Sequence, residues 1–250
     1  MTSLSIILIT KNEAANIDAC LESVAWADEI IVVDSGSTDD TVARCQTFGA
    51  KVYVHDWQGF GIQKNRALSY ATQEWVFSID ADERVTPELR AAIETAMTQA
   101  QFPAYRVSRL SNYCGRFMRH SGWYPDHIVR LFQRGKARFN DALVHETLVV
   151  QGKTGLLAGE LLHYSYDNLE QVLNKTNAYS TAAAQMKYQQ GKSASLTGAV
   201  LRGLWTFFRT YCLRLGFLDG RQGLMVAVSN AEETYYRYLK LMLLNEKARR

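Results

Sequence analysis

The acidic pair in Asp80-Ala81-Asp82 is the part of the sequence whose residue types and spacing point most directly to chemistry, and it follows an apolar, strand-like run. Two carboxylates two residues apart at the end of a strand can point the same way and share one hard divalent cation, which prefers oxygen ligands. Such a cation neutralises the charge that builds up on a diphosphate leaving group. A solvent-exposed turn can contain the same acidic residues without binding a metal. The residues around the pair therefore decide between the two interpretations.

Polar side chains also follow the first two predicted strands. The first strand ends at Thr10 and precedes Asn12 and Glu13, and the second ends at Asp34. Ligands of parallel α/β sheets bind outside the carboxyl ends of the strands. We therefore expect these side chains to surround one ligand, with Asp34 accepting hydrogen bonds from a nucleobase or ribose. Helix capping is the alternative role for Asp34 and Asn12.

Strand and helix patterns alternate through the first hundred residues. Apolar or β-branched runs predict strands at Leu4–Thr10, Glu29–Asp34, Lys51–His55 and Glu74–Asp80. Helical spacing and end signals predict helices at Asn16–Val24, from Ser37 to Gly49, at Gly61–Ala71 and from Pro87 onward. This alternation predicts an α/β fold with a mostly parallel sheet that helices cover on both faces.

The pattern changes after residue 104. Strands are expected at Ala104–Arg109, Ile128–Gln133, Leu143–Val150 and Gly155–Tyr164, and helices at Asp167–Gln190, Ser195–Gly216 and Gln222–Ala248. We therefore predict one domain at 1–165, with halves at 1–100 and 101–165, and a helical C-terminal extension at 166–250.

Composition indicates a packed protein rather than a disordered one, with 47% hydrophobic and 21% charged residues. The four cysteines are scattered without a CxxC pair, which argues against a zinc site and favours a reducing cytoplasm. The N-terminus has no basic leader or cleavage site, so we expect that the chain is not exported. From Lys187 to Arg250 there are eleven Lys and Arg against four Asp and Glu, which suggests an anionic partner for the tail.

The predicted helix at Ser195–Gly216 combines large apolar residues with Arg202, Arg209 and Arg214. These arginines interrupt the stretch well short of the roughly 20 mostly apolar residues that a transmembrane helix needs. We expect an amphipathic helix that lies on an anionic bilayer or packs on the domain at 1–165, and both can hold at once.

The runs SIILITKNEAANIDACLESV, EIIVVDSGSTDDT and SIDADE resemble the donor half of the family 2 inverting glycosyltransferases, which have the GT-A fold. The resemblance covers the 1–100 half. It implies that this half binds a nucleotide sugar and that 101–165 is the acceptor half of the catalytic domain. It also implies nucleoside contacts for Thr10, Asn12, Glu13 and Asp34, a place near the uracil or diphosphate for Lys64, a ribose or metal contact for Asp80, and a metal-binding role for Asp82 with Mn²⁺ or Mg²⁺.

Inverting transfer needs a base that takes the proton of the acceptor hydroxyl. The candidates are Asp126, Asp141 and Glu146. We favour Glu146, because it neighbours His145 in LVHET and many family members carry a similar pair there, and Asp126 is the nearest rival. The Glu-Asp dipeptide typical of the family is missing.

Further candidate residues lie in the second half, and of these only the role of His163 comes from the resemblance. His163 is expected as a third metal ligand, with interior packing as its alternative role. Trp123 is expected to stack on an acceptor sugar, and Arg130 and His145 to contact the acceptor. An ordinary core position for Trp123 and a solvated basic face for Arg130 are the alternatives.

The segment RLGFLDGRQGLMVAVSNAEETYYRYLKL resembles the C-terminal region of bacterial lipopolysaccharide core glucosyltransferases, which extends the resemblance to nearly the whole chain. It implies transfer of a hexose, with glucose from UDP-glucose as the expected donor, to an inner-core heptose of lipopolysaccharide. The expected partners are a UDP-hexose donor, a lipid-linked glycan acceptor and an anionic membrane surface, with no nucleic acid. The expected location is peripheral, on the cytoplasmic face of the inner membrane.

Two other functions remain open from the residues. One is a sugar-phosphate nucleotidyltransferase, which the missing Gly-rich GxGxR-like loop after the first strand disfavours. The other is an inactive nucleotide-sugar-binding membrane scaffold, which the intact acidic pair disfavours. The absence of GxGxxG at the first strand turn disfavours an oxidoreductase.

Overall fold

The computed structural model describes residues 2–140 and 147–248 and divides into two compact units. Unit 1 comprises Met1–Arg109 and Asp126–His163, and unit 2 comprises Leu110–Pro125 and Tyr164–Arg250. The segment at 110–125 therefore groups with the C-terminal helices, whereas a single boundary at residue 165 would place it with the first domain.

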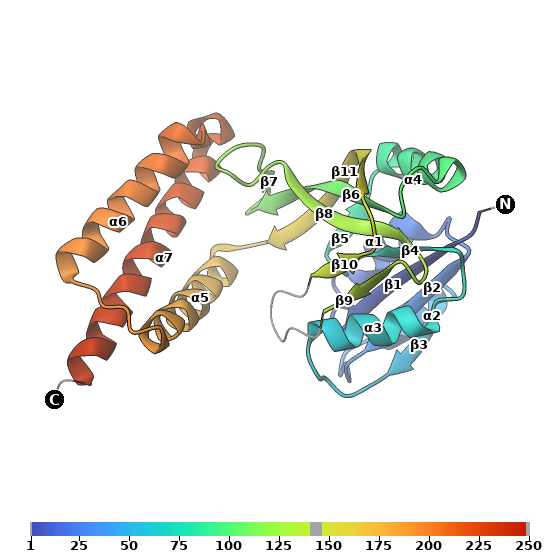
Figure 1. Cartoon of the computed structure of the whole chain (residues 1–250), viewed down its shortest axis with the longest axis horizontal. Helices are drawn as coiled ribbons and strands as arrows, with labels where there is room; N and C mark the ends of the chain where they lie inside the picture. Colours follow the sequence, from blue (N-terminus) through green and yellow to red (C-terminus); the bar gives the residue numbers. More distant parts are fainter. Residues whose placement is uncertain (1, 141–146, 249–250) are drawn as a thin grey trace. The chain divides into compact units, whose positions relative to one another are not determined.

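A mixed β-sheet forms the centre of unit 1 (Figure 1). Its strands are β1 (Leu4–Thr10), β2 (Glu29–Asp34), β3 (Lys51–Val54), β4 (Trp75–Ser78), β5 (Glu83–Val85), β6 (Ala104–Tyr113), β8 (Asp126–Gln133) and β11 (Thr154–Tyr166), in the order β3-β2-β1-β4-β8-β6-β11-β5. The first four strands in this order are parallel. Antiparallel pairing joins β8 to β4 and β6, and β5 to β11. A separate hairpin pairs β9 (Ala137–Phe139) with β10 (Leu148–Val150).

Helices cover both faces of the parallel strands, as the sequence predicts. They are α1 (Ile17–Val24), α2 (Thr41–Thr47), α3 (Phe60–Tyr70) and α4 (Pro87–Gln99). Neighbouring β1 residues face opposite cores: Leu8 packs in the core that includes α1 and α4, and Ile7 in the core that includes α3. Both faces are buried, which explains why the strand reads as a continuous apolar run.

The loop after β2 differs from the prediction. Helix α2 begins at Thr41 rather than near Ser37. The Ser37 hydroxyl donates to Asp34 Oδ2 at 2.6 Å and accepts from the Asn12 backbone N–H at 2.8 Å. Ser37 therefore ties the ends of β1 and β2 together instead of capping a helix.

Unit 2 contains three long helices, α5 (Leu169–Gln189), α6 (Leu196–Phe208) and α7 (Gly220–Lys247), and the short strand β7 (Arg116–Phe117), which pairs with the end of β6. Helix α7 packs against both α5 and α6. A π-helical turn at Arg209–Leu213 and a 3-10 turn at Gly216–Asp219 connect α6 to α7, so the predicted single helix at Ser195–Gly216 ends early. Among the described helices, none combines the length and the apolar character that crossing a bilayer requires.

Candidate active site

The ends of β1 and β2 are joined through Asp34, a buried carboxylate. Its Oδ2 accepts from the Thr10 hydroxyl at 2.8 Å and from the Ser37 hydroxyl at 2.6 Å. Its Oδ1 accepts from the backbone N–H groups of Gly36 and Ser37 at 2.9 and 2.7 Å. A carboxylate offers about four acceptor positions, so these four bonds occupy Asp34. Asp34 therefore fixes the loop after β2. A nucleoside hydroxyl could bond to Asp34 only by replacing one of these four donors.

The loop after β1 is fixed in the same way. Asn12 adopts a left-handed backbone conformation with φ 56°, which Asn tolerates better than most residues, and its side-chain oxygen accepts from the Thr38 N–H at 2.8 Å. Asn16 donates to the Glu13 carboxylate at 3.0 Å. Partial burial raises the pKa of Glu13 above its ordinary value, and the nearby Asp82 carboxylate adds to the shift.

Two adjacent residues of α3 connect the second and fourth strand ends. The buried Gln63 side chain donates to the Ser35 hydroxyl at 2.9 Å, directly after β2. The Nζ of Lys64, which is 6% exposed, lies 3.1 Å from Asp80 Oδ1, just beyond β4. The predicted nucleotide-binding residues at these strand ends therefore belong to one linked set.

Asp80 is held by a second cation, Arg130 of β8. Arg130 Nη2 lies 2.6 Å from Asp80 Oδ2 and 2.6 Å from Glu83 Oε1. Burial opposes ionisation of Asp80, but Arg130 and Lys64 outweigh it and hold the pKa of this carboxyl far below its ordinary value. Arg130 is itself buried and its guanidinium pairs with Asp80 and Glu83, which excludes the solvated basic face as its setting, and its acceptor contact stays a prediction.

Glu83 and Arg84 stabilise the acidic turn, and sequence reasoning missed both. Glu83 is fully buried, and its Oε2 accepts from the Asp80 N–H at 3.0 Å. Arg84 donates to the Ala81 carbonyl at 2.7 Å and to the Asn16 carbonyl at 2.8 Å. The only signal in the sequence is their position directly after the acidic pair, where a polar surface is equally plausible.

Asp82 and His163 form the pair best suited to a metal ion. Asp82 Oδ2 lies 3.3 Å from His163 Nε2, and the two side chains are 33% and 19% exposed. Strand β11 brings His163 there by pairing it with Glu83 of β5. A carboxylate oxygen and an imidazole nitrogen are suitable ligands for Mn²⁺ or Mg²⁺. Among the described residues no group of three or more His, Cys, Asp and Glu forms a complete metal cage, so a bound ion would need further ligands from the substrate or water.

Comparison with known proteins shows the family. Residues 5–148 match the model of the glycosyl transferase family 2. The chain belongs to this family. Its predicted class, a nucleotide-sugar-dependent glycosyltransferase, and its predicted α/β fold are confirmed.

Relatives of this glycosyltransferase match over almost the whole chain. An uncharacterised glycosyltransferase of Rickettsia typhi is 35% identical over 100% of this chain and 90% of the relative. A lipopolysaccharide core biosynthesis glycosyltransferase, LpsC of Rhizobium meliloti, is 31% identical over 94% of this chain and 93% of its own length. The solved glucosyl-3-phosphoglycerate synthase of Mycobacterium tuberculosis is 26% identical over 44% of each chain, with a TM-score of 0.38.

Of the candidates for the catalytic base of the glycosyltransferase, the structure describes only Asp126. Glu146, its neighbour His145 and the further candidate Asp141 lie outside the described residues. The rival candidate Asp126 accepts two hydrogen bonds from Arg109, at 2.9 and 2.7 Å, on its Oδ2. Arg109 also lies 3.6 Å from Glu83, so Asp126 is connected to the cluster around Asp80.

Trp123 belongs to unit 2. Its ring meets that of Tyr113 edge to face, with centroids 5.5 Å apart, and lies 6.1 Å from that of Tyr166. These aromatic rings pack on the small core around Met118 and Val226. The structure thus gives Trp123 a packing role within unit 2, which is the alternative that the sequence leaves open.

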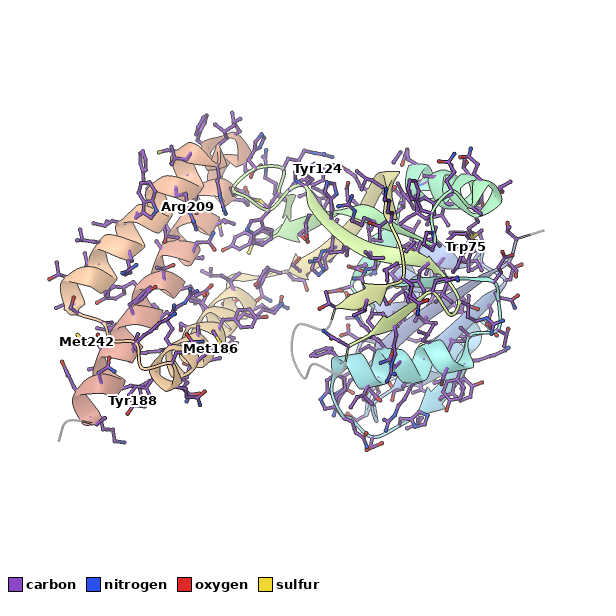
Figure 2. All side chains as sticks on the ribbon, viewed as in Figure 1. Trp75, Tyr124, Met186, Tyr188, Arg209 and Met242 are labelled. Atoms are coloured by element: carbon purple, nitrogen blue, oxygen red, sulfur yellow. The ribbon has the colours of Figure 1, made fainter. Side chains whose placement is uncertain are left out.

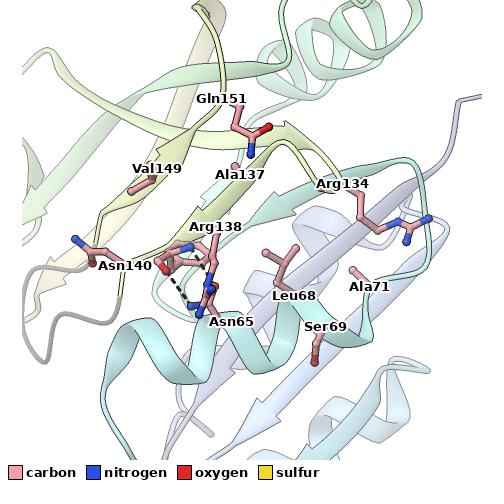
Figure 3. A pocket seen from close by; sticks show the side chains of 12 residues that line it. Asn65, Leu68, Ser69, Ala71, Arg134, Ala137, Arg138, Asn140, Val149 and Gln151 are labelled. Carbon is pink, nitrogen blue, oxygen red and sulfur yellow. Dashed lines mark hydrogen bonds between the residues drawn. The ribbon is translucent and has the colours of Figure 1, made fainter.

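A cavity of about 940 Å³ lies elsewhere in unit 1, between α3 and the β9–β10 hairpin (Figure 3). Asn65 fixes the hairpin there by bonding the backbone N–H and carbonyl of Phe139 at 3.1 and 2.9 Å. None of the described residues that line it is Asp, Glu, His or Cys. The described lining of this cavity therefore offers no base and no metal ligand, whereas the described strand ends offer both.

Proposed function

We propose that this glycosyltransferase transfers glucose from UDP-glucose to an inner-core heptose of lipopolysaccharide, with inversion at the anomeric carbon. The observation that carries the proposal is the Asp82–His163 pair beside the Lys64–Asp80–Arg130 cluster, on the strand-end side of the sheet. The name of the Rhizobium meliloti relative supports a lipopolysaccharide core acceptor.

The strand-end residues are proposed to bind the UDP-hexose donor. Thr10, Asn12, Glu13 and Asp34 shape the two loops that would frame the nucleoside. Lys64 is held next to Asp80 by their 3.1 Å ion pair, so its position is set before the donor arrives. A fixed donor lowers the entropic part of the barrier to transfer.

Asp82 and His163 are proposed to hold Mn²⁺ or Mg²⁺, with the remaining ligands from the diphosphate and water. Such an ion, when bound, supplies positive charge to the departing diphosphate. Asp80 is the poorer ligand, because Lys64 and Arg130 occupy its two oxygens. Asp80 is proposed to set the charge and shape of the site and to contact the ribose.

Glu146 is proposed to accept the proton of the attacking heptose hydroxyl, with His145 beside it on the acceptor side. Asp126 is the second candidate, and its ion pair with Arg109 would have to loosen before it could act as a base. We further propose a peripheral location on the cytoplasmic face of the inner membrane, where the lipid-linked acceptor is assembled. No role in nucleic-acid binding is proposed.

Transfer assays with UDP-glucose, Mn²⁺ and an inner-core heptose acceptor test this function. The expected products are UDP and an acceptor heavier by one hexose, detected by mass spectrometry. Asp82→Asn should lower the rate of transfer by roughly three orders of magnitude, whereas the matched control Asp40→Asn, at an exposed position, should leave it unchanged.

Three outcomes would contradict the proposal. Release of pyrophosphate instead of UDP would indicate a nucleotidyltransferase. Binding of UDP and Mn²⁺ without turnover on any heptose acceptor would indicate the scaffold. An unaltered core oligosaccharide in cells that lack this protein would refute the acceptor.

A further inference from the structure

Helix α6 turns its small residues toward α7. Ala199 and Gly203 are its buried residues, and a Cβ atom at Gly203 would lie 3.3 Å from the Ala231 carbonyl oxygen of α7. One turn further on, the Thr206 hydroxyl donates to that of Thr234 at 3.3 Å. The interface between the two helices therefore depends on close backbone approach rather than on large apolar side chains.

The large apolar residues of α6 point away from α7. Leu201, Leu204, Trp205 and Phe208 are 61%, 63%, 55% and 46% exposed. A helix of a water-soluble domain has the opposite arrangement, with its large apolar stripe against the core. Small residues between helices and large apolar residues outside are instead typical of helix pairs that contact lipid. The pattern of α6 thus indicates an apolar medium on its outer side.

The turn after α6 exposes a second set of apolar side chains. Leu213, Leu215, Phe217 and Leu218 are 58%, 45%, 48% and 49% exposed. Leu215 also has a left-handed backbone with φ 55°, a conformation that Gly and Asn adopt more easily. Both the backbone and the exposure disfavour Leu at this position in water, so its apolar side chain needs another explanation.

A rigid frame presents this turn. The buried Asp219 carboxylate accepts from the backbone N–H groups of Arg119 and His120 at 3.2 and 3.0 Å and from the Ser121 hydroxyl at 3.2 Å. The Ser121 N–H in turn donates to the Arg214 carbonyl at 2.8 Å. The exposed leucines therefore do not result from a loosely held loop.

The charges around these apolar residues have one sign. Between Leu196 and Leu224 the exposed charged side chains are all arginines, namely Arg202, Arg209, Arg214 and Arg221. The one acidic residue of the segment, Asp219, is buried in the frame. Figure 2 shows Arg209 where α6 gives way to the exposed turn. Positive charge beside exposed Leu, Trp and Phe matches the headgroup zone of an anionic bilayer.

We propose that the outer face of α6 and the turn at 213–218, together the insertion surface, enter the headgroup region of an anionic membrane. The inference deepens the proposed function and rests on it for the lipid-linked acceptor that the membrane carries. A second copy of the chain fits this surface less well, because a symmetric dimer would place its arginines against one another.

Sedimentation of the full-length protein with lipid vesicles tests the proposal. The probes are phosphatidylethanolamine vesicles with about one-third phosphatidylglycerol, and pure phosphatidylcholine vesicles as the uncharged comparison. The variants are L215N/L218Q in the turn and L201Q/L204Q on α6. The matched control is V54Q/L156Q, which removes equally exposed apolar side chains from unit 1.

We expect binding to the anionic vesicles only, and a roughly tenfold weaker partition for each variant pair, since two leucines no longer enter the interface. Raising the salt concentration should weaken binding by the wild type. The V54Q/L156Q control should bind as the wild type does. Equal binding by all proteins, or no binding to anionic vesicles, would overturn the proposal. If the wild-type protein forms a dimer and does not bind vesicles, and both variant pairs are monomers, the surface is an interface with a second copy of the chain.

Transfer to a soluble, delipidated core acceptor separates this inference from the proposed function. The variants should transfer to it at the wild-type rate, because the insertion surface contains none of the proposed donor-binding or metal-binding residues. If the wild-type protein binds vesicles but transfers no hexose, the proposed function is refuted and the insertion surface stands. If it transfers hexose but does not bind vesicles, the insertion surface is refuted and the proposed function stands.

Discussion

The two units of this glycosyltransferase place polar and apolar side chains in opposite ways. At the strand ends of unit 1, the charged groups of Glu83 and Arg130 are buried, and they and the partly buried Asp80 are held by several partners each. In unit 2, leucines of α6 and of the following turn lie in the open. Buried charges must be paired to be tolerated, whereas exposed apolar side chains need an apolar partner. Each unit therefore departs from the usual distribution where it is proposed to meet a ligand, a nucleotide sugar in one and a lipid surface in the other.

The largest effect is expected in unit 1, when the proposed metal ligand Asp82 is replaced. Asp82→Asn should lower kcat by roughly three orders of magnitude, because the charge on the leaving diphosphate loses its counter-ion. EDTA should abolish activity of the wild type, and added Mn²⁺ should restore it. Steady-state release of UDP measures both. Full activity in EDTA, or an Asp82→Asn enzyme within a few-fold of the wild type, would remove the metal from the site.

The next effect concerns the buried charges themselves. Arg130→Met should destabilise unit 1 by about 3–5 kcal/mol, because it leaves the buried carboxylate of Glu83 without its main counter-ion and removes one of the two cations that hold the partly exposed Asp80. Urea unfolding measures the loss. Adding Glu83→Gln to Arg130→Met should restore part of the stability, since one uncompensated charge disappears. If Arg130→Met alone unfolds at the wild-type urea concentration, the cluster is not the support of the acidic turn.

A buried carboxylate at the start of β2 gives a pH-dependent test. Burial opposes ionisation of Glu29, but hydrogen bonds from Lys51, Ser5 and Thr72 outweigh it and lower its pKa to about 2. The folded pKa is below the ordinary value, so the stabilisation is complete above about pH 4.5 and is lost as the pH falls toward 2. Glu29→Gln should thus cost roughly 3 kcal/mol at neutral pH, and its gap to the wild type should close in acid. Unfolding at several pH values measures the gap, and the exposed Glu22→Gln is the control. A gap that stays constant with pH would contradict the assignment.

The local parts of this arrangement were predictable, and the long-range parts were not. The bounds of β1 and β2 follow from apolar runs that are buried on both faces, and Thr86 caps α4 one residue before Pro87 as its position suggests. The order of the strands and the family resemblance placed Asp34 and Asp80 at one edge. Nothing local indicates that Arg130 reaches back 50 residues to Asp80, because antiparallel β8 brings it there only after the chain has folded.

The same limit applies to unit 2. Amphipathic character of the segment at 195–216 could be predicted from its mixture of arginines and apolar residues, but not which side would face inward. That depends on α7, which meets Ala199 and Gly203 rather than Leu204 or Phe208. The helix was predicted to run to Gly216, whereas α6 and the π-helical turn that follows it end at Leu213. Asp219 holds the following segment by bonding residues 119–121, a contact about 100 residues away in sequence.

The smallest expected effect sharpens the comparison from the unit 2 side. Leu215→Asn should leave the protein as stable as the wild type or raise its stability by up to about 1 kcal/mol, because Asn adopts the left-handed conformation at lower cost. Thermal unfolding in the absence of lipid measures this, with Leu218→Gln as the control for loss of an exposed leucine without backbone relief. A leucine that packing requires would give the opposite result, a clear loss of stability for Leu215→Asn. A gain would mean that water favours a different residue at this position, so that the apolar side chain of Leu215 acts only where the protein meets something other than water.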